Sequence, residues 1–322
     1  MTGVQTCALP ILTSKVAVIG PPTVPDADVD YLFGQVSIDS PYVSYSGMCG
    51  NISAGVAPYA IEEGMVEAVE PVTKVRVHSV NLDRVFVTEV PVKDGMPVIH
   101  GDYVVDGVPG TGSRLDIDMA RMAGSFGHGI LPTGNAKDVL HVPGSGDIEG
   151  SLVDVTNPCF FIRAEDLGLR GDEVRDSDFP EGRLEEIEMI RREVFHILGK
   201  KYDEKDAVPF VAFVTKPADY INHLTGEMIC GEDVDFLSRL YFLGRIHQAY
   251  AGSVSCCTGA AAVIPGTVVA DVRKSSDSGT IRIGHPAGII EVEACIRETG
   301  NGLQIEKLSY GRTARRIMDG LC

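Results

Sequence analysis

The residues best suited to chemistry surround Cys49, in the stretch YSGMCGNISAG at 45–55. Gly47 and Gly50 let the backbone turn sharply and come close to a ligand. Asn51 or the preceding turn can cap the helix that we expect next, and the free N–H groups of a helix start can bind a carboxylate. The same positive end of a helix favours a thiolate. Cys49 is therefore either a base for proton transfer or a small buried residue at a helix cap.

A similar pattern recurs in the stretch SCCTGAAAVI at 255–264, where Cys256 and Cys257 begin a second helix of small residues. Chemistry is less strongly indicated here, because Cys and Ala replace each other easily in a tight helix interface. The two stretches make the halves of the chain similar in plan. This is a structural pseudo-repeat that is weak in sequence identity.

Three more places in the chain could face a ligand. His285 and Gly288 lie in the turn GHPAG between two predicted strands, where the imidazole either donates to a carboxylate or only serves the turn. Asn157 lies in a turn at the end of a strand. Lys15, within TSKVAVI, lies inside a predicted strand. A lysine there either faces water at a sheet edge or is buried, and a buried amine can act as a base.

Nucleotide and metal signals are weak in this chain. The string GVPGTGS at 107–113 contains a GxxGxG spacing, but no helix follows it, so turn chemistry explains it better than a nucleotide loop does. The eight cysteines form no CxxC pair and no Cys/His metal spacing. We therefore predict no metal and no cofactor, and a reduced cytoplasmic enzyme whose thiols are mostly small core residues.

Charge and hydropathy narrow the classes of partner. The chain has 322 residues and a formal net charge of −17, which argues against a nucleic-acid backbone and against an anionic membrane surface. No apolar run approaches the roughly 18 residues that a membrane-spanning helix needs. A pocket can still oppose the global charge and bind a small anion. The expected partner is a small anionic substrate, and we allow for a homodimer.

Strand-like segments dominate the predicted secondary structure, and they are separated by turn residues. One helix, at 182–201, is clearly amphipathic, with apolar residues along one stripe. Strand patterns cover 15–20, 28–38, 74–81, 84–92, 101–107, 150–164, 209–216, 266–272, 279–285 and 288–298, and helical patterns cover 51–66, 182–201, 234–250, 255–264 and 311–321.

The chain is long for one domain and typical of two. The polar, Gly- and Pro-rich stretch at 131–150 is the best boundary. The first ten residues after Met1 match the translation of a common sequencing adapter, so we expect residues 1–11 to be foreign and the domain after them to be incomplete. The expected parts are therefore an adapter-derived segment, an N-terminal domain, a C-terminal domain and a terminal helix that packs back on the first domain, at 1–11, 12–140, 141–305 and 306–322.

Several ordered blocks together resemble the PrpF-like isomerases, a family that includes 2-methylaconitate isomerase, 3-methylitaconate isomerase and 4-oxalomesaconate tautomerase. The blocks include LTSKVAVI, SGMCGNISAGVAPYAIEEG, SLVDVTNPCFFIRA, IRIGHPAG and RTARRIMDG, and the resemblance runs from about residue 12 to the end. It implies an α+β fold like that of diaminopimelate epimerase. In that fold two similar domains each wrap a curved, mostly antiparallel sheet around a central helix, with the active site between them.

The resemblance also implies a chemistry, a 1,3-proton shift in an unsaturated di- or tricarboxylate without metal or cofactor. Lys15 and Cys49 correspond to the proposed acid/base residues. Fixed N–H donors would stabilise the charge that develops when a proton leaves. The residues expected to hold the substrate are Ser14, Gly50, Asn51, Asn157, Cys257, Thr258, His285 and Gly288.

Two departures from the family pattern keep alternatives open. The chain has no counterpart to a family block of the type Arg-Gly-Gly-Thr-Ser-Lys-Gly, whose serine is a second proposed catalytic residue. The stretch CCTGA also resembles the second-cysteine block of the epimerases, and the sequence does not decide whether Cys256 or Cys257 takes that place. The alternatives are therefore a two-cysteine amino-acid epimerase and a catalytically impaired fragment.

Overall fold

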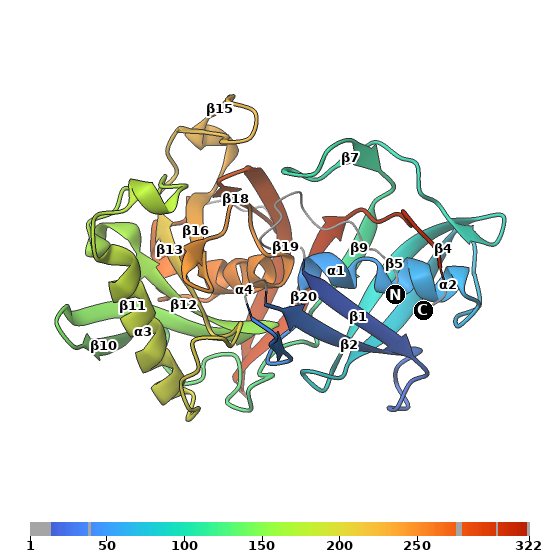
Figure 1. Cartoon of the computed structure of the whole chain (residues 1–322), viewed down its shortest axis with the longest axis horizontal. Helices are drawn as coiled ribbons and strands as arrows, with labels where there is room; N and C mark the ends of the chain where they lie inside the picture. The colour runs from blue at the N-terminus through green and yellow to red at the C-terminus, as the bar shows by residue number, and fades with distance from the viewer. Residues whose placement is uncertain (1–13, 38–39, 275–278, 301, 321–322) are drawn as a thin grey trace. The chain divides into compact units, whose positions relative to one another are not determined.

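The structure is a computed structural model that describes residues 14–37, 40–274, 279–300 and 302–320 (Figure 1). The chain divides into two compact units. Unit 1 comprises Met1–Met122 and Ser309–Cys322, and unit 2 comprises Ala123–Leu308. This division falls earlier in the chain than the boundary expected at 140–141. The segment 1–11, which we expect to be foreign, lies outside the described residues.

Unit 1 is built on a sheet with the strand order β1-β2-β4-β5-β9-β20, in which residues 309–312 of β20 pair with β9. The β2–β4 pair is parallel, and the other neighbours are antiparallel. Short strands β3 and β6 pair with β2 and β5, and β7 and β8 form a hairpin. The bounds are β1 Lys15–Gly20, β2 Val29–Val36, β3 Val43–Ser44, β4 Val72–Ser79, β5 Arg84–Lys93, β6 Met96–Pro97, β7 Tyr103–Val104, β8 Thr111–Gly112, β9 Leu115–Asp118 and β20 Gly302–Arg312.

Burial along β4 and β9 of unit 1 follows the period of two that a half-covered sheet requires, whereas β2 is buried on both faces. In β4, Thr73, Val75 and Val77 are buried, whereas the residues between them are exposed. In β1, only Val18 is exposed, so its even-numbered positions face outward and Lys15 shares the inward face. In β4 the sequence period therefore already indicates which face meets the core.

The helix predicted at 51–66 is present as two short helices, α1 (Gly50–Ser53) and α2 (Val56–Glu62). Most of their residues are buried, and α1 packs against β1. Small side chains make this close packing of helix on sheet feasible. Unit 1 thus places a short, small-residue helical segment against its sheet, as expected.

Unit 2 contains a sheet with the order β19-β18-β16-β13-β12-β11-β10, and residues 302–308 of β20 lie beside β19. The pairs β12–β13 and β16–β18 are parallel, and the other pairs of known register are antiparallel. The bounds are β10 Asp138–Val142, β11 Gly146–Val155, β12 Asn157–Arg163, β13 Phe210–Thr215, β14 Tyr220–Ile221, β15 Met228–Ile229, β16 Phe236–Phe242, β17 Arg245–Ile246, β18 Thr280–His285 and β19 Gly288–Thr299.

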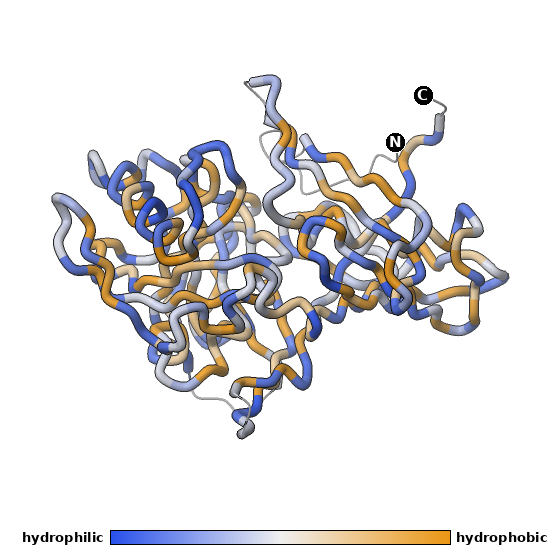
Figure 2. The backbone as a smooth tube through the Cα atoms, turned by 90° about the horizontal axis from the view of Figure 1, so that it is seen from below, coloured by the Kyte–Doolittle hydropathy of each residue, from blue (hydrophilic) through white to orange (hydrophobic). Residues whose placement is uncertain are grey.

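Two longer helices cover the sheet of unit 2. Helix α3 (Arg183–Ile197) is the predicted amphipathic helix, and it packs on β10 and β13 (Figure 1). Helix α4 (Gly252–Val263) is the predicted small-residue helix, buried against β19, β11 and β12. Along the tube of Figure 2, apolar stretches in the elements alternate with polar loops. No helix in the described ranges is long and apolar enough to cross a membrane.

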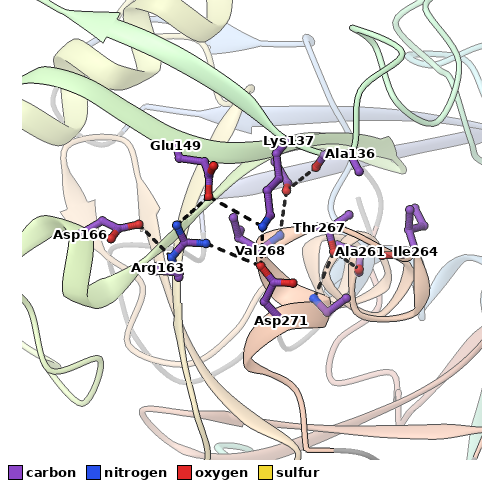
Figure 3. A network of polar contacts seen from close by, with 12 residues as sticks. Ala136, Lys137, Glu149, Arg163, Asp166, Ala261, Ile264, Thr267, Val268 and Asp271 are labelled. Carbon is purple, nitrogen blue, oxygen red and sulfur yellow. Dashed lines mark hydrogen bonds and ion pairs between the residues drawn. The ribbon is translucent and has the colours of Figure 1, made fainter.

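Two predicted elements of unit 2 are wrong. The helix predicted at 234–250 is the strand pair β16 and β17, since β16 is buried on both faces between β13 and β18 and therefore lacks alternation. The strand predicted at 266–272 is a short helix, α5 (Val268–Val272), which Thr267 caps by accepting from Ala270 N at 3.1 Å. Ion pairs from Lys137 and Arg163 to Asp271 hold α5 in place (Figure 3).

The terminal helix predicted at 306–322 is also wrong. Residues 302–312 are β20, and the described residues after it are extended. Within this extended segment, Arg316 forms ion pairs at the C-terminal end of α2. Its Nε lies 2.8 Å from Glu62 and its Nη2 lies 2.5 Å from Glu63. The basic run that looks helical in sequence is therefore the end of a strand and an extended segment, which Arg316 joins to α2 within unit 1.

Candidate active site

A row of polar side chains crosses one end of the sheet in unit 1. Lys15 of β1 pairs with Gln35 of β2, and Gln35 pairs with Ser44 of β3. Residues directly opposite each other point to the same face, and two strand spacings separate Lys15 from Ser44 by about 10 Å. Gln35 and Ser44 are buried, and Lys15 is half-buried. The backbone carbonyl of Ser14 accepts from Val36 N at 2.9 Å and joins the same row.

Tyr31 lies on the same face of β2 as Gln35, because the two are separated by an even number of residues. Its ring packs edge-on against Phe86, with the ring centroids 6.4 Å apart, and the side chain is fully buried. Its hydroxyl has no hydrogen-bond partner among the described residues. Burial, and then the nearby Cys49 and Tyr310, raise the pKa of the phenol well above its ordinary value.

The Tyr31 hydroxyl is notable because a buried polar group without a hydrogen-bond partner normally lowers the stability of the folded state by roughly 1–3 kcal/mol. Tyr31 keeps its proton, so its hydroxyl can donate as well as accept a hydrogen bond. A negative charge on the nearby Cys49 sulfur would favour the donor role. Cys49 itself is half-buried, at the N-cap position of α1.

The end of β20 holds the turn that carries Cys49. The Tyr310 hydroxyl donates to the Gly50 carbonyl at 2.9 Å, and Arg312 Nε donates to Asn51 Oδ1 at 3.0 Å. Both donors are buried. Two of the predicted substrate-binding residues, Gly50 and Asn51, are therefore fixed by a strand whose sequence lies at the far end of the chain.

The cysteines of α4 lie in a different environment. Cys256 and Cys257 are fully buried, and the Cys257 Sγ lies 3.3 Å from the Val153 carbonyl. Burial raises the pKa of the Cys257 thiol, so a thiolate is disfavoured there. The next residue, Thr258, is equally buried, and its hydroxyl donates to the Val254 carbonyl at 2.8 Å.

Asn157 begins β12 and reaches the start of α4. Its Nδ2 donates to Ser253 Oγ at 2.8 Å, and both side chains are buried. The preceding residue, Thr156, has a φ of 67°, which is unusual for a β-branched residue. Its hydroxyl donates to the Ser253 carbonyl at 2.5 Å. This strained connection fixes Asn157 against the first turn of α4.

His285 ends β18 and lies close to Tyr250, with ring centroids 6.2 Å apart. Its Nδ1 accepts a hydrogen bond from Ala287 N at 3.2 Å, and this bond stabilises the tight turn between His285 and Gly288. Tyr250 OH contacts Thr258 Oγ1 at 3.0 Å. Thr258 and His285 thus meet around Tyr250, while Gly288 accepts from a different tyrosine through its carbonyl.

Sequence reasoning missed five polar residues around the Cys49 turn. A buried polar residue inside an apolar strand, such as Gln35 in β2, was the available signal. The missed residues are Tyr31, Gln35, Ser44, Tyr310 and Arg312.

The arrangement in unit 1 offers an amine, a thiol and fixed hydrogen-bond donors. Such a set can remove a proton from one carbon, stabilise the negative charge and return a proton elsewhere. Within the described residues no group of three or more His, Cys, Asp or Glu side chains could hold a metal ion.

The fold is of the α+β class, and each unit carries a sheet and a small-residue helix. Residues 7–322 match the family described as PrpF protein. The chain belongs to this family, and it is an isomerase. The match begins inside the segment 1–11, so it does not support the expectation that this whole segment is foreign.

The relatives of this chain include isomerases with named substrates. The 3-methylitaconate isomerase of Eubacterium barkeri is 47% identical over 96% of this chain and 82% of its own. The 2-methyl-aconitate isomerase of Shewanella oneidensis is 36% identical over 96% of this chain and 81% of its own. The (4E)-oxalomesaconate Delta-isomerase of Novosphingobium sp. strain KA1 is 35% identical over 96% of this chain and 82% of its own.

Solved structures agree with the fold. The structure of methylitaconate-delta-isomerase is 46% identical, with a TM-score of 0.84 over 96% of this chain and 80% of that chain. A hydroxyproline epimerase from Agrobacterium vitis shares the fold at 12% identity, with a TM-score of 0.56 over 94% of this chain and 74% of that chain. The expected epimerase-like α+β fold is confirmed.

Proposed function

We propose that this isomerase moves the carbon–carbon double bond of methylitaconate, or of a close unsaturated dicarboxylate, by a 1,3-proton shift. A base removes the proton from the saturated carbon between a carboxylate and the double bond, and the electron pair spreads over the allylic system. A proton then adds to the terminal methylene carbon, which becomes a methyl group. The reaction is redox-neutral and needs only an acid and a base.

Lys15 and Cys49 are our candidates for the two acid/base residues. The observation that carries this assignment is their placement in unit 1. Lys15 lies on the same face of the β1–β2 pair as Tyr31. Cys49 in turn lies near enough to Tyr31 to help raise the pKa of its phenol. The 47% identity to the methylitaconate isomerase favours that substrate over methylaconitate and oxalomesaconate.

A two-cysteine racemase is the rival enzyme class, and the burial of the α4 cysteines counts against it. It would need a second thiolate, whereas burial raises the pKa of Cys257. Racemisation of proline by the purified chain would favour this rival.

The test is to supply methylitaconate, methylaconitate and oxalomesaconate separately to the purified chain and to follow each by ¹H NMR. We expect turnover with methylitaconate to be fastest and to disappear in Lys15→Met. Full activity of Lys15→Met, or no turnover of any of the three substrates, would reject the proposal.

We also propose a cytoplasmic homodimer. None of the six cysteines among the described residues forms a disulfide bond, which suits a reducing compartment. Light scattering on the purified protein would measure its mass, and a monomer at working concentration would contradict the homodimer.

A further inference from the structure

Unit 1 contains a pocket between the β7–β8 hairpin and the end of β20, with a volume of about 110 Å³. A space of this size suits a small ligand, since pockets for drug-sized ligands run from roughly 300 to 1,000 Å³. Residues 108–112 of the GVPGTGS stretch line the pocket.

Two glycines seat the hairpin on β20. A Cβ on Gly311 would run into the ring of Tyr103, and a Cβ on Gly112 would lie 3.2 Å from the side chain of Thr313. The Tyr103 ring in turn lies under the guanidinium of Arg114, 5.2 Å away. The wall of the pocket is thus set by close packing of hairpin against strand.

Arg312 lines this pocket and brings a buried positive charge to it. The side chain is 7% exposed. Its Nε donates to Asn51 Oδ1 at 3.0 Å, its Nη1 donates to the Gly311 carbonyl at 2.8 Å, and its guanidinium lies 4.7 Å from the Tyr310 ring centroid. In the part of the chain that the structure describes, no carboxylate forms an ion pair with it.

Arg316, four residues further along the chain, differs from Arg312 in having carboxylate partners. Arg316 is paired with both Glu62 and Glu63. A buried charge without a counter-charge is costly, and proteins usually pair it or bring it to a ligand. Arg315 and His100 line the same pocket. A chain of net charge −17 therefore concentrates basic groups around one small space.

We propose that this pocket binds one carboxylate of the unsaturated polycarboxylate substrate through Arg312 and Arg315. The inference rests on the proposed function and adds to it the residues that recognise the substrate. Asn51 belongs both to the pocket and to the turn that carries Cys49, so a carboxylate held there places the rest of the substrate towards the thiol. A guanidinium can donate two parallel hydrogen bonds to a carboxylate.

The test replaces Thr111, which lines the pocket and is exposed. Thr111→Asp adds a carboxylate that competes for the arginines, and Thr111→Asn is the uncharged control of the same shape. Succinate, which cannot isomerise, is the probe in isothermal titration calorimetry. We expect Thr111→Asp to weaken succinate binding at least about tenfold, the loss of one charge-assisted hydrogen bond, and Thr111→Asn to change it less than about twofold. Equal binding by the two variants would overturn the proposal.

A second pair of variants keeps the test independent of hairpin folding. Arg315→Gln removes one charge from the pocket, and Arg121→Gln removes one outside it, where Arg121 pairs with Asp26. We expect only Arg315→Gln to raise KM, by about tenfold, with kcat nearly unchanged. Equal KM values for both variants would contradict the proposal.

Kinetics with succinate distinguish a substrate subsite from a separate effector site. We expect succinate to compete with the substrate and to raise its KM alone. A fall in kcat without a change in KM would place the carboxylate outside the substrate site and overturn the inference. If no substrate turns over at all, the proposed function fails, whereas the calorimetric comparison still decides whether the pocket binds carboxylates.

Discussion

The two small-residue helices look alike in sequence but place their cysteines differently. Cys49 precedes α1 and is half-buried, whereas Cys256 and Cys257 lie inside α4 and are fully buried. Around Cys49 lie an orphaned phenol and a strand that fixes the turn. Around Cys257 lies the backbone of Val153, Val155 and Cys159. The pseudo-repeat is thus a repeat of packing, in which the first cysteine is half-buried and the second pair is fully buried.

The sharpest way to break this comparison is to remove one thiol from each helix. Cys49→Ser should lower kcat/KM roughly a thousandfold, because it removes an acid/base group. Cys257→Ala should keep activity within about threefold while costing about 1 kcal/mol of unfolding free energy. Steady-state rates and urea denaturation measure both. An inactive, well-folded Cys257→Ala would instead favour two-cysteine chemistry.

Thiol reactivity tests the same difference without mutation. The exposed Cys230 and Cys295 should be alkylated first, Cys49 next, and the buried Cys257 at least about a hundredfold more slowly than Cys49. Mass spectrometry of peptides after timed iodoacetamide treatment measures how fast each cysteine is alkylated. Alkylation of Cys257 as fast as Cys49 in the native protein would contradict the burial argument.

Tyr31→Phe tests whether the orphaned phenol serves the thiol. We expect activity to fall about tenfold, together with slower alkylation of Cys49, while the unfolding free energy stays within about 1 kcal/mol or rises, since no hydrogen bond is lost. Tyr241→Phe is the control, because its hydroxyl donates to Glu188 Oε2 at 2.8 Å. That variant should lose about 1 kcal/mol of stability and keep its activity.

The opposite pattern would assign Tyr31 a purely structural role. A Tyr31→Phe protein that is clearly less stable and fully active would show that the hydroxyl does not act through Cys49.

The smallest expected effect concerns acid stability in each unit. The hydrogen bond from Arg163, against the opposing effect of burial, holds the pKa of Glu149 below its ordinary value of 4.5, and Arg76 does the same for Asp28. Because these folded-state pKa values are depressed, the stabilisation is present above the unfolded values and is lost as pH falls through the folded ones. Arg163→Gln and Arg76→Gln should each raise the acid midpoint of unfolding by about 0.3 pH units.

Circular dichroism during acid titration measures both midpoints. The free energy of unfolding of each variant should differ most from that of the wild type near pH 7, and the difference should shrink as pH falls, since the wild-type advantage is lost when the paired carboxylate is protonated. Midpoints at or below that of the wild type would contradict the assigned ion pairs.

Periodicity predicted the elements that have one buried face. Helix α3 and strand β4 follow their expected periods, and the sequence located both. It located the buried strands β12 and β13 but failed at β16, which is also buried on both sides. Strand β16 has no polar face, so its run of apolar residues fits a buried helix equally well.

Local chemistry explains the remaining differences. The Val268-Val269 pair suggests a strand, but the Thr267 cap and its salt-bridged neighbours favour a helix. At the candidate site, glycines and the cysteine marked the Cys49 turn. Arg312 and Tyr310 were missed because they meet that turn only through long-range pairing of β20 with β9, which a local pattern does not contain.

The most direct test of a single-thiol proton shift is to run the reaction on methylitaconate in deuterated water. In ¹H NMR, wild-type product should carry one deuterium in its newly formed methyl group. Cys257→Ala should give the same result, and Cys49→Ser should incorporate deuterium roughly a thousandfold more slowly. Deuterium entering the product at the wild-type rate with Cys49→Ser would contradict the account.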